Sequence, residues 1–118
     1  MAFIAVTSFD AAKSFYGGTL GLEVTEESPF AVVLDAGGTS LRLARVDSFA
    51  PQPFTVAGWR VSDMSDAVDA LTDRGVAFLR FDGMDQDGTG VWTTPGGDRV
   101  AWFKDPDGNT LSITQFAI

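Results

Sequence analysis

The sequence predicts an α+β protein made of two tandem β-α-β-β-β modules in one domain. The chain has 118 residues, which suits one compact domain, and 45% of them are hydrophobic, as in globular proteins. A strand-then-helix pattern at residues 2–20 also returns at residues 56–75. Neither module can bury its own sheet face, so we expect the two to pack together.

The internal repeat can be aligned residue by residue in two places. In the strand-helix part, Val6 aligns with Val61, Ser8 with Asp63, Ala12 with Ala67, and Tyr16 with Leu71. Further along, "DAGGTSLRLA" aligns with "TPGGDRVAWF", which places Gly37 on Gly96 and Leu41 on Val100. We predict module 1 at about residues 1–47, a linker at about 48–55 and module 2 at about 56–118.

The first module begins with an apolar strand at residues 2–8. Ser8 is a helix N-cap candidate, and Asp10 follows in the first turn, where the helix dipole favours an anion. Apolar side chains then recur at helical spacing. Three strands follow, and a Gly-Gly pair marks a tight hairpin between the last two. The apolar stripe is Phe9, Ala12, Tyr16 and Leu20, the strands are residues 22–28, 30–36 and 39–46, and the hairpin is Gly37-Gly38.

The second module repeats this order after a proline-containing linker. Asp63 caps a predicted helix, and Gly75 is placed to end it. The turn at residues 105–109 is explicit: Pro106 presets φ, Asp105 can accept backbone N–H groups, and Gly108 or Asn109 takes the left-handed conformation. The helix stripe is Met64, Val68 and Leu71, and the strands are residues 56–62, 76–81, 90–94, 99–104 and 109–116.

Composition excludes several kinds of chemistry. The chain has no Cys and no His, which removes disulfides, thiolate metal sites and the usual general base at neutral pH. A net charge of −8 opposes binding to nucleic acid and to anionic membranes. The N-terminus lacks the basic region of a signal peptide, and no apolar run is long enough to span a bilayer. We therefore expect a cytoplasmic protein with no nucleic-acid or membrane partner.

The whole chain resembles the vicinal oxygen chelate superfamily of glyoxalases, bleomycin-binding resistance proteins and extradiol dioxygenases. The likeness is carried by "SFYGGTLGLEV", "GWRVSDMSDAVDALTDRGV" and "VAWFKDPDGNTLSITQ". The resemblance implies mixed sheets that curl into a cup or incomplete barrel, with the helices outside. Metal-dependent members bind one divalent ion in the cup through four side chains, usually His and Glu. Here the corresponding positions fall at or near Met1, Arg42, Val56 and Ser112.

None of these four positions holds a good ligand for a transition metal, which prefers imidazole, thiolate or carboxylate. No His exists that a shift of alignment could bring into place. An all-carboxylate site among Glu23, Glu26, Glu27 and the aspartates is conceivable, but most of these residues fall in turns and caps. We expect no metal and no cofactor.

Strand alternation predicts which side chains line the cup. If Ser112 and Val56 face inward, so do their neighbours two residues away, while Leu111, Ile113, Trp59 and Val61 face the helices. Arginines in such a lining suit an anion, whereas the net charge favours a cation, so the ligand's charge stays open. The predicted ligand-binding residues are Phe3, Ser40, Arg42, Val56, Arg60, Phe103, Ser112, Thr114 and Phe116.

Three functions are compatible with this sequence. We favour a metal-free protein that binds a small organic molecule, such as an antibiotic or aromatic metabolite, in a homodimer. The first alternative is a lyase, isomerase or dioxygenase-like enzyme with an unorthodox metal or none, using Tyr16, Asp35 or Glu23 as a base. The second is a structural or regulatory protein whose cup is filled by its own side chains. We assign no catalytic residue.

Overall fold

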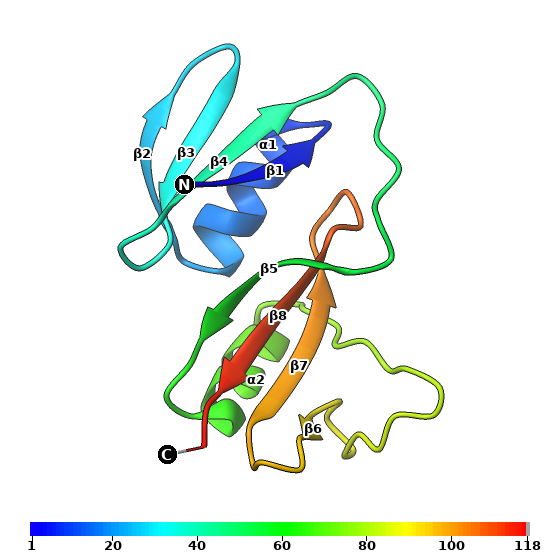
Figure 1. Ribbon diagram of the computed structural model, residues 1–118. Helices are drawn as coiled ribbons and strands as arrows, with labels where there is room; N and C mark the ends of the chain where they lie inside the picture. The colour runs from blue at the N-terminus through cyan, green and yellow to red at the C-terminus, as the bar shows by residue number, and fades with distance from the viewer. Residues whose placement is uncertain (118) are drawn as a thin grey trace. The chain divides into compact units, whose positions relative to one another are not determined.

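The computed structural model describes residues 1–117 and is shown in Figure 1. The chain divides into two compact units. Unit 1 contains Met1–Gln52 together with Asp105–Asn109, and unit 2 contains Pro53–Lys104 and the residues from Thr110 onward. Each unit has an open four-stranded mixed sheet and a helical segment, which confirms the predicted α+β class with two modules.

Unit 1 has the strand order β1-β4-β3-β2, in which β1 and β4 are parallel and the other pairs antiparallel. Ser8 caps the helix by accepting the Ala11 N–H at 3.3 Å, as predicted. The helical segment then continues as a π-helix through the Gly17-Gly18 pair. The elements are β1 (Ala2–Val6), α1 (Phe9–Lys13), π-helix η1 (Ser14–Thr19), β2 (Glu23–Glu27), β3 (Ala31–Asp35) and β4 (Ser40–Arg45).

The core of unit 1 lies on one face of its sheet. On the helix side, side chains at alternate positions of β1, β3 and β4 are buried together with Ala12 and Tyr16 of the helical segment, and β3 also has Ala31 and Val33 buried on its other face. This alternation follows from the pleat of the strands. The opposite face contains the cross-strand row Phe3, Arg42, Val33 and Glu26. The buried strand residues on the helix side are Ile4, Val6, Val32, Leu34, Leu41 and Leu43.

The hairpin between β3 and β4 forms at the predicted glycine pair. Gly37 and Gly38 have φ values of +78° and +99°, a region that L-residues with side chains rarely occupy. Asp35 Oδ1 accepts the Gly38 N–H at 2.9 Å, and Ala36 N–H donates to Thr39 O at 2.8 Å. This confirms the tight hairpin predicted from the sequence.

Unit 2 has the matching order β5-β8-β7-β6, again with one parallel pair, β5 and β8. In Figure 1, α2 lies behind this sheet, so the face turned toward the viewer has no helix over it. The elements are β5 (Thr55–Arg60), α2 (Met64–Asp73), β6 (Trp92–Thr93), β7 (Arg99–Lys104) and β8 (Thr110–Gln115).

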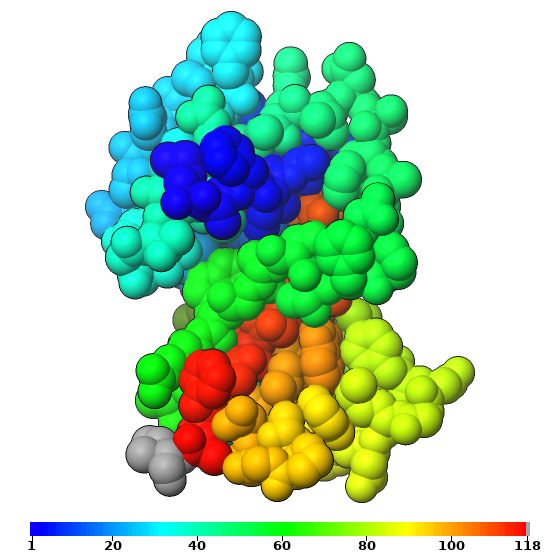
Figure 2. Space-filling model, in the orientation of Figure 1, coloured from blue at the N-terminus to red at the C-terminus, as the bar shows by residue number. Residues whose placement is uncertain are grey.

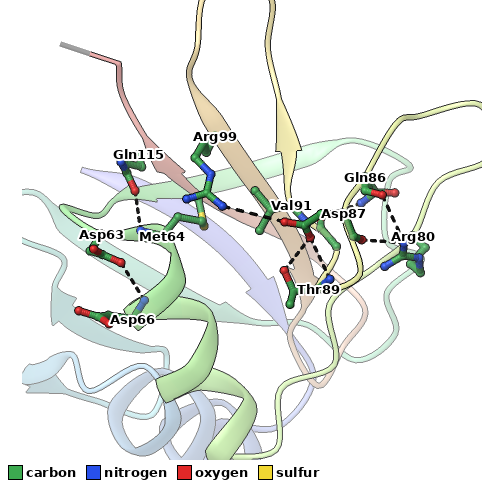
Figure 3. Close-up of polar contacts among 11 residues, drawn as sticks. Asp63, Met64, Asp66, Arg80, Gln86, Asp87, Thr89, Val91, Arg99 and Gln115 are labelled. Atoms are coloured by element: carbon green, nitrogen blue, oxygen red, sulfur yellow. Dashed lines mark hydrogen bonds and ion pairs between the residues drawn. The ribbon is translucent and has the colours of Figure 1, made fainter.

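Helix α2 begins and ends at the predicted residues. Asp63 Oδ1 accepts the Asp66 N–H at 2.9 Å, and Gln115 Oε1 accepts the Met64 N–H at 2.6 Å (Figure 3). Gly75 follows the helix with φ +93°, and Val76 N–H donates to Leu71 O, as in a Schellman motif. No helix among residues 1–117 is long and apolar enough to cross a membrane.

The strand predicted at residues 76–81 is wrong, because this segment forms no strand in the structure. Leu79 N–H makes one sheet-like bond, to Trp102 O at 2.8 Å. The Gln86 side chain replaces a neighbouring strand: its Nε2 donates to Leu79 O and Gly90 O, and its Oε1 accepts the Phe81 N–H. A side chain thus satisfies backbone groups that pairing would otherwise satisfy. The strand predicted at residues 90–94 is reduced to Trp92–Thr93.

The second part of the repeat alignment is also wrong by one strand. Both units follow the same order, so β4 corresponds to β8, and β3 to β7. The counterpart of the Gly37-Gly38 hairpin is therefore the turn at residues 105–109, and Gly96 belongs to the preceding connection. The similar "GG" dipeptides had favoured the wrong pairing, because both occupy turns that join antiparallel strands.

Candidate functional site

The uncovered face of the unit 2 sheet contains three predicted ligand-binding residues, Arg60, Ser112 and Thr114. Cross-strand pairing forms two adjacent rows on it: Gly58, Ser112 and Trp102, then Arg60, Thr114 and Val100. Leu111 and Ile113 are buried on the other face, as predicted. Gly58, Arg60, Ser112 and Thr114 thus share one sheet face, as strand alternation predicts.

Gly58 is required by the close approach of Ser112. A Cβ placed on Gly58 would collide with Ser112 Oγ and lie 3.3 Å from Ser112 O. Ser112 is buried, so its side chain occupies the space that a side chain at position 58 would need. The centre of this face is consequently formed by small side chains and bare backbone.

The placement of Phe103 on this face is wrong. Phe103 pairs with Leu111 on the helix-covered face, is fully buried, and packs edge-on against Phe78 at 5.8 Å between ring centroids. Trp102 takes the position opposite Ser112 instead. The one-strand error in the repeat alignment explains this wrong placement. Aligning Gly37 with Gly96 also aligns Ala44 of β4 with Phe103, and Ala44 shares a sheet face with Arg42.

Trp102 is the residue that sequence reasoning failed to place. Its Nε1–H donates to Thr55 Oγ1 at 3.1 Å, Phe81 packs edge-on at 5.4 Å, and Trp92 stacks at 6.3 Å between centroids. These contacts hold a partly exposed indole over β7. Counting back from the residue 105–109 turn would have found it, since Lys104 pairs with Thr110 and Trp102 therefore with Ser112.

A groove of about 610 Å³ opens at the end of β5 and β8. Figure 2 shows the end of β8, in red, at the molecular surface beside β5, in green. The Arg60 guanidinium carbon lies 5.2 Å from the centroid of the Phe116 ring, so the structure brings together two predicted site residues. The groove is lined by Arg60, Val61, Ser62, Gln115, Phe116 and Ala117.

The chain after β8 is held in place by the turn that precedes β7. Asp98 Oδ1 accepts the Ala117 N–H at 2.8 Å. Gly97, with φ +95°, leaves room for Ala117: a Cβ at Gly97 would lie 3.2 Å from the Ala117 Cβ. Although Phe116 is 47% exposed, Asp98 fixes the backbone after it, and the Met64 N–H holds the side chain of Gln115 before it.

Unit 1 contributes three further predicted residues, Phe3, Ser40 and Arg42. Phe3, which is 67% exposed, pairs with Arg42 on the sheet face away from the core, and Ser40 pairs with Asp35 on the same face. Val56, in unit 2, lies at an irregularity in β5, because the register shifts between Thr55 and Ala57. This local bulge, which sequence spacing could not reveal, leaves Val56 37% exposed and without a regular cross-strand partner.

The side chains at the positions implied for a family metal do not fit one. Met1 and Val56 are exposed apolar residues, Arg42 is a cation in a sheet row, and Ser112 is packed against Gly58. A guanidinium has no lone pair to offer a dication and repels it. Within residues 1–117, no three His, Cys, Asp or Glu side chains form a cluster that could hold a metal ion.

The candidate bases do not form a catalytic site. Tyr16 is fully buried and donates a hydrogen bond to Asp105 Oδ2, and burial, followed by that bond, raises the pKa of Tyr16. A tyrosine that acts as a base needs a pKa lowered toward neutral pH and access to a substrate, so the structure argues against Tyr16 in this role. Asp35 accepts a turn N–H, and Glu23 lies exposed on β2.

Two units of this topology, each with an open mixed sheet uncovered on one face, define a class of proteins with paired β-α-β-β-β modules. A family model described as "Glyoxalase/Bleomycin resistance protein/Dioxygenase superfamily" matches residues 1–113. The chain belongs to this superfamily. A comparison with curated proteins gave no match.

Solved structures share the fold over nearly the whole chain. A superfamily member from Sphaerobacter thermophilus is 27% identical, with a TM-score of 0.72 and coverage of 98% of this chain and 94% of that one. The fosfomycin resistance protein FosX from Listeria monocytogenes is 11% identical, with a TM-score of 0.78 and coverage of 99% of this chain and 91% of that one. Lactoylglutathione lyase from Agrobacterium tumefaciens is 18% identical, with a TM-score of 0.68 and coverage of 98% of this chain and 92% of that one. The latter two identities establish similarity of fold alone.

Proposed function

We propose that this protein binds a small organic molecule without a metal ion. The observation that carries the proposal is the chemistry of Met1, Arg42, Val56 and Ser112, which occupy the positions implied for metal ligands. They offer a thioether, a guanidinium, a hydrocarbon and a hydroxyl, in a chain with neither His nor Cys. These groups suit an organic ligand, which needs apolar contact and a few fixed polar groups.

We propose binding residues from the sheet strands of each unit, together with Phe116, which follows the end of β8. Trp102 joins them because it lies opposite Ser112, and Phe103 is removed because it is in the core. The aromatic members can contact a ring, the hydroxyls can donate to polar atoms, and the arginines can bind an anionic group bidentately. The proposed set is Phe3, Ser40, Arg42, Val56, Arg60, Trp102, Ser112, Thr114 and Phe116.

The biological role we propose is sequestration. A cytoplasmic homodimer would capture an antibiotic or an aromatic metabolite and release it unchanged. Support comes from the superfamily, whose description includes bleomycin resistance proteins, and from a shared fold with a protein named for fosfomycin resistance. The edge strand β2, which is exposed along its length, could pair with a second copy.

A thermal-shift screen tests this function. Protein purified without chelators is heated with a panel of aromatic antibiotics and metabolites, and separately with Zn²⁺, Ni²⁺ and Mn²⁺. A ligand at 100 times its dissociation constant adds about 2.7 kcal/mol to the free energy of unfolding. We expect at least one organic compound to raise the Tm and none of the metals to do so.

Two further measurements complete the test. Mass spectrometry of the bound compound after long incubation distinguishes capture, in which the mass is unchanged, from turnover. Elemental analysis of the purified protein detects a resident ion. A stoichiometric divalent metal, or a panel in which no compound raises the Tm, would refute the proposal.

A further inference from the structure

We propose that the groove at the end of β5 and β8 binds a planar aromatic carboxylate, with the carboxylate on Arg60 and the ring against Phe116. This inference rests on the proposed function, because it names the class of ligand and the place where it binds. It concerns unit 2 alone, since all six residues that line the groove belong to that unit.

Arg60 supplies a cation that no carboxylate side chain of residues 1–117 pairs with. No Asp or Glu oxygen among residues 1–117 lies within 4.0 Å of its guanidinium, because the ion pairs described there involve Lys13 and Arg99. Arg60 is exposed at the end of β5 and faces the groove. A planar guanidinium donates two parallel N–H bonds to a carboxylate, which makes it the strongest anion-binding group in this groove.

Phe116 sets the shape of the ligand. Its ring lies 5.2 Å from the Arg60 guanidinium carbon and is 47% exposed, so an aromatic surface and a cation are presented side by side. Exposing such a side chain to water costs free energy that a bound ring would recover. A ligand with a carboxylate directly on an aromatic ring can contact both groups at once.

The remaining groove groups complement an oxygen-rich ligand edge. Gln115 Oε1 is used by the Met64 N–H, which leaves the Gln115 amide nitrogen as the donor on that side chain (Figure 3). Ser62 adds a hydroxyl to the lining. The nearby carboxylates of Asp63 and Asp98 each accept a backbone N–H, from Asp66 and Ala117 respectively. Asp98 thus fixes Ala117 in the groove wall, whereas Asp63 caps α2.

The net charge of −8 does not oppose this assignment at close range. Charges more than about 8–10 Å apart are largely screened at physiological salt, whereas a direct guanidinium-carboxylate contact is not. The groove volume of about 610 Å³ falls in the range of small-molecule sites, about 300–1,000 Å³. The charge of Arg60, rather than the net charge of the protein, therefore determines that the groove prefers an anionic ligand.

The test compares three probes of the same size: 2-naphthoate, 2-naphthamide and 2-naphthylmethylamine. Each is titrated into ¹⁵N-labelled protein, and amide shifts are followed by NMR. We expect 2-naphthoate to bind most tightly, with the largest shifts at Arg60, Ser62, Gln115 and Ala117. The Arg60→Gln substitution should weaken 2-naphthoate binding by about tenfold or more and narrow its advantage over the neutral amide.

Matched variants distinguish binding in this groove from binding elsewhere on the protein. Phe116→Leu should weaken binding several-fold, whereas Lys104→Gln, an exposed cation outside the groove, should leave it unchanged. Arg42→Gln tests whether 2-naphthoate binds to Arg42, the other arginine in the predicted ligand-binding set. Unchanged spectra outside the groove show that each variant is folded.

Different results overturn different statements. Binding of 2-naphthoate that Arg42→Gln abolishes and Arg60→Gln leaves intact would refute this inference and keep the proposed function. A preference for the amine probe, or failure of 2-naphthoate to bind while another compound does, would do the same. If no compound of any class binds, the proposed function itself fails.

Discussion

The Tyr16 hydroxyl donates a 2.6 Å hydrogen bond to Oδ2 of Asp105, a residue 89 positions further along the chain. Both side chains are buried. Asp105 also accepts from Asn109 Nδ2 at 2.8 Å and from the backbone N–H groups of Asp107 and Asn109 at 3.0 and 2.8 Å. Four donors thus replace water around one buried carboxylate, as a charge in such a place requires.

Removing the Tyr16 hydroxyl should destabilise the protein. Tyr16→Phe keeps the ring in the core but leaves Asp105 with one fewer donor. Because bonds to buried charged groups contribute about 1.5–3 kcal/mol, we expect the free energy of unfolding in urea to fall by roughly that amount. Thr25→Val, which removes a longer, part-buried bond of 3.2 Å from a neutral hydroxyl to Val33 O, should have a smaller effect. Equal effects of the two substitutions would contradict this account.

Stability should also fall at alkaline pH because of Tyr16. Burial, followed by the hydrogen bond to Asp105, raises the pKa of Tyr16 above its ordinary value of 10.0. The unfolded state therefore releases this proton first, so the contribution is complete below pH 10 and is lost as pH rises above that value. The expected slope is about 1.4 kcal/mol per pH unit. Urea titrations between pH 9 and 11 should show a shallower decline for Tyr16→Phe, and parallel curves would rule the mechanism out.

Adding a methyl group at Gly58 should destabilise unit 2 through Ser112. Gly58→Ala places a Cβ against Ser112 Oγ, and overpacking of this kind costs about 1–3 kcal/mol. Ser112→Ala removes the clashing oxygen, so most of the loss should disappear when Gly58→Ala is made in that background. A double-mutant cycle by urea denaturation measures the coupling. Additive effects would show that the two positions do not interact in this way.

The Asp87 carboxyl should titrate below its ordinary range. Its Oδ1 accepts the Thr89 hydroxyl at 2.7 Å and the N–H groups of Thr89 and Val91 (Figure 3). The Thr89 hydroxyl is the largest cause of the lowered pKa. We expect NMR titration to show an upward shift of this pKa in Thr89→Val, while Thr89→Ser should retain the low value. No shift in Thr89→Val would refute this assignment.

The lowered pKa of Asp87 also predicts how the stability of the protein changes with pH. A carboxyl with a depressed folded pKa contributes above its unfolded pKa of 3.8, and the contribution is lost as pH falls through the folded value. The Asp87 side chain is 49% exposed, so this contribution is small. Acid unfolding of wild-type protein and Thr89→Val should consequently differ only slightly.

Local sequence signals predicted the elements that short-range interactions determine. Ser8 and Asp63 cap helices because their side chains reach N–H groups three residues ahead. Gly37, Gly75 and Gly108 adopt positive φ because a side chain disfavours that region. Alternation also predicted the uncovered face of β8, which contains Ser112 and Thr114.

Long-range pairing decided what the sequence could not. The loss of a strand at residues 76–81 depends on the Gln86 side chain, whose amide substitutes for a neighbouring backbone. The exchange of Phe103 for Trp102 depends on strand register, because a shift of one residue moves every side chain to the opposite face.

The sequence by itself determined two β-α-β-β-β modules, their caps and turns, and a donor inventory without imidazole or thiolate. These features depend on residue identity and on contacts within a few positions. Only the tertiary structure decided that Tyr16 bonds to Asp105 and that the Arg60 guanidinium lies over the Phe116 ring. Such pairs form only after strand order and register are set, and those depend on packing between segments far apart in the chain.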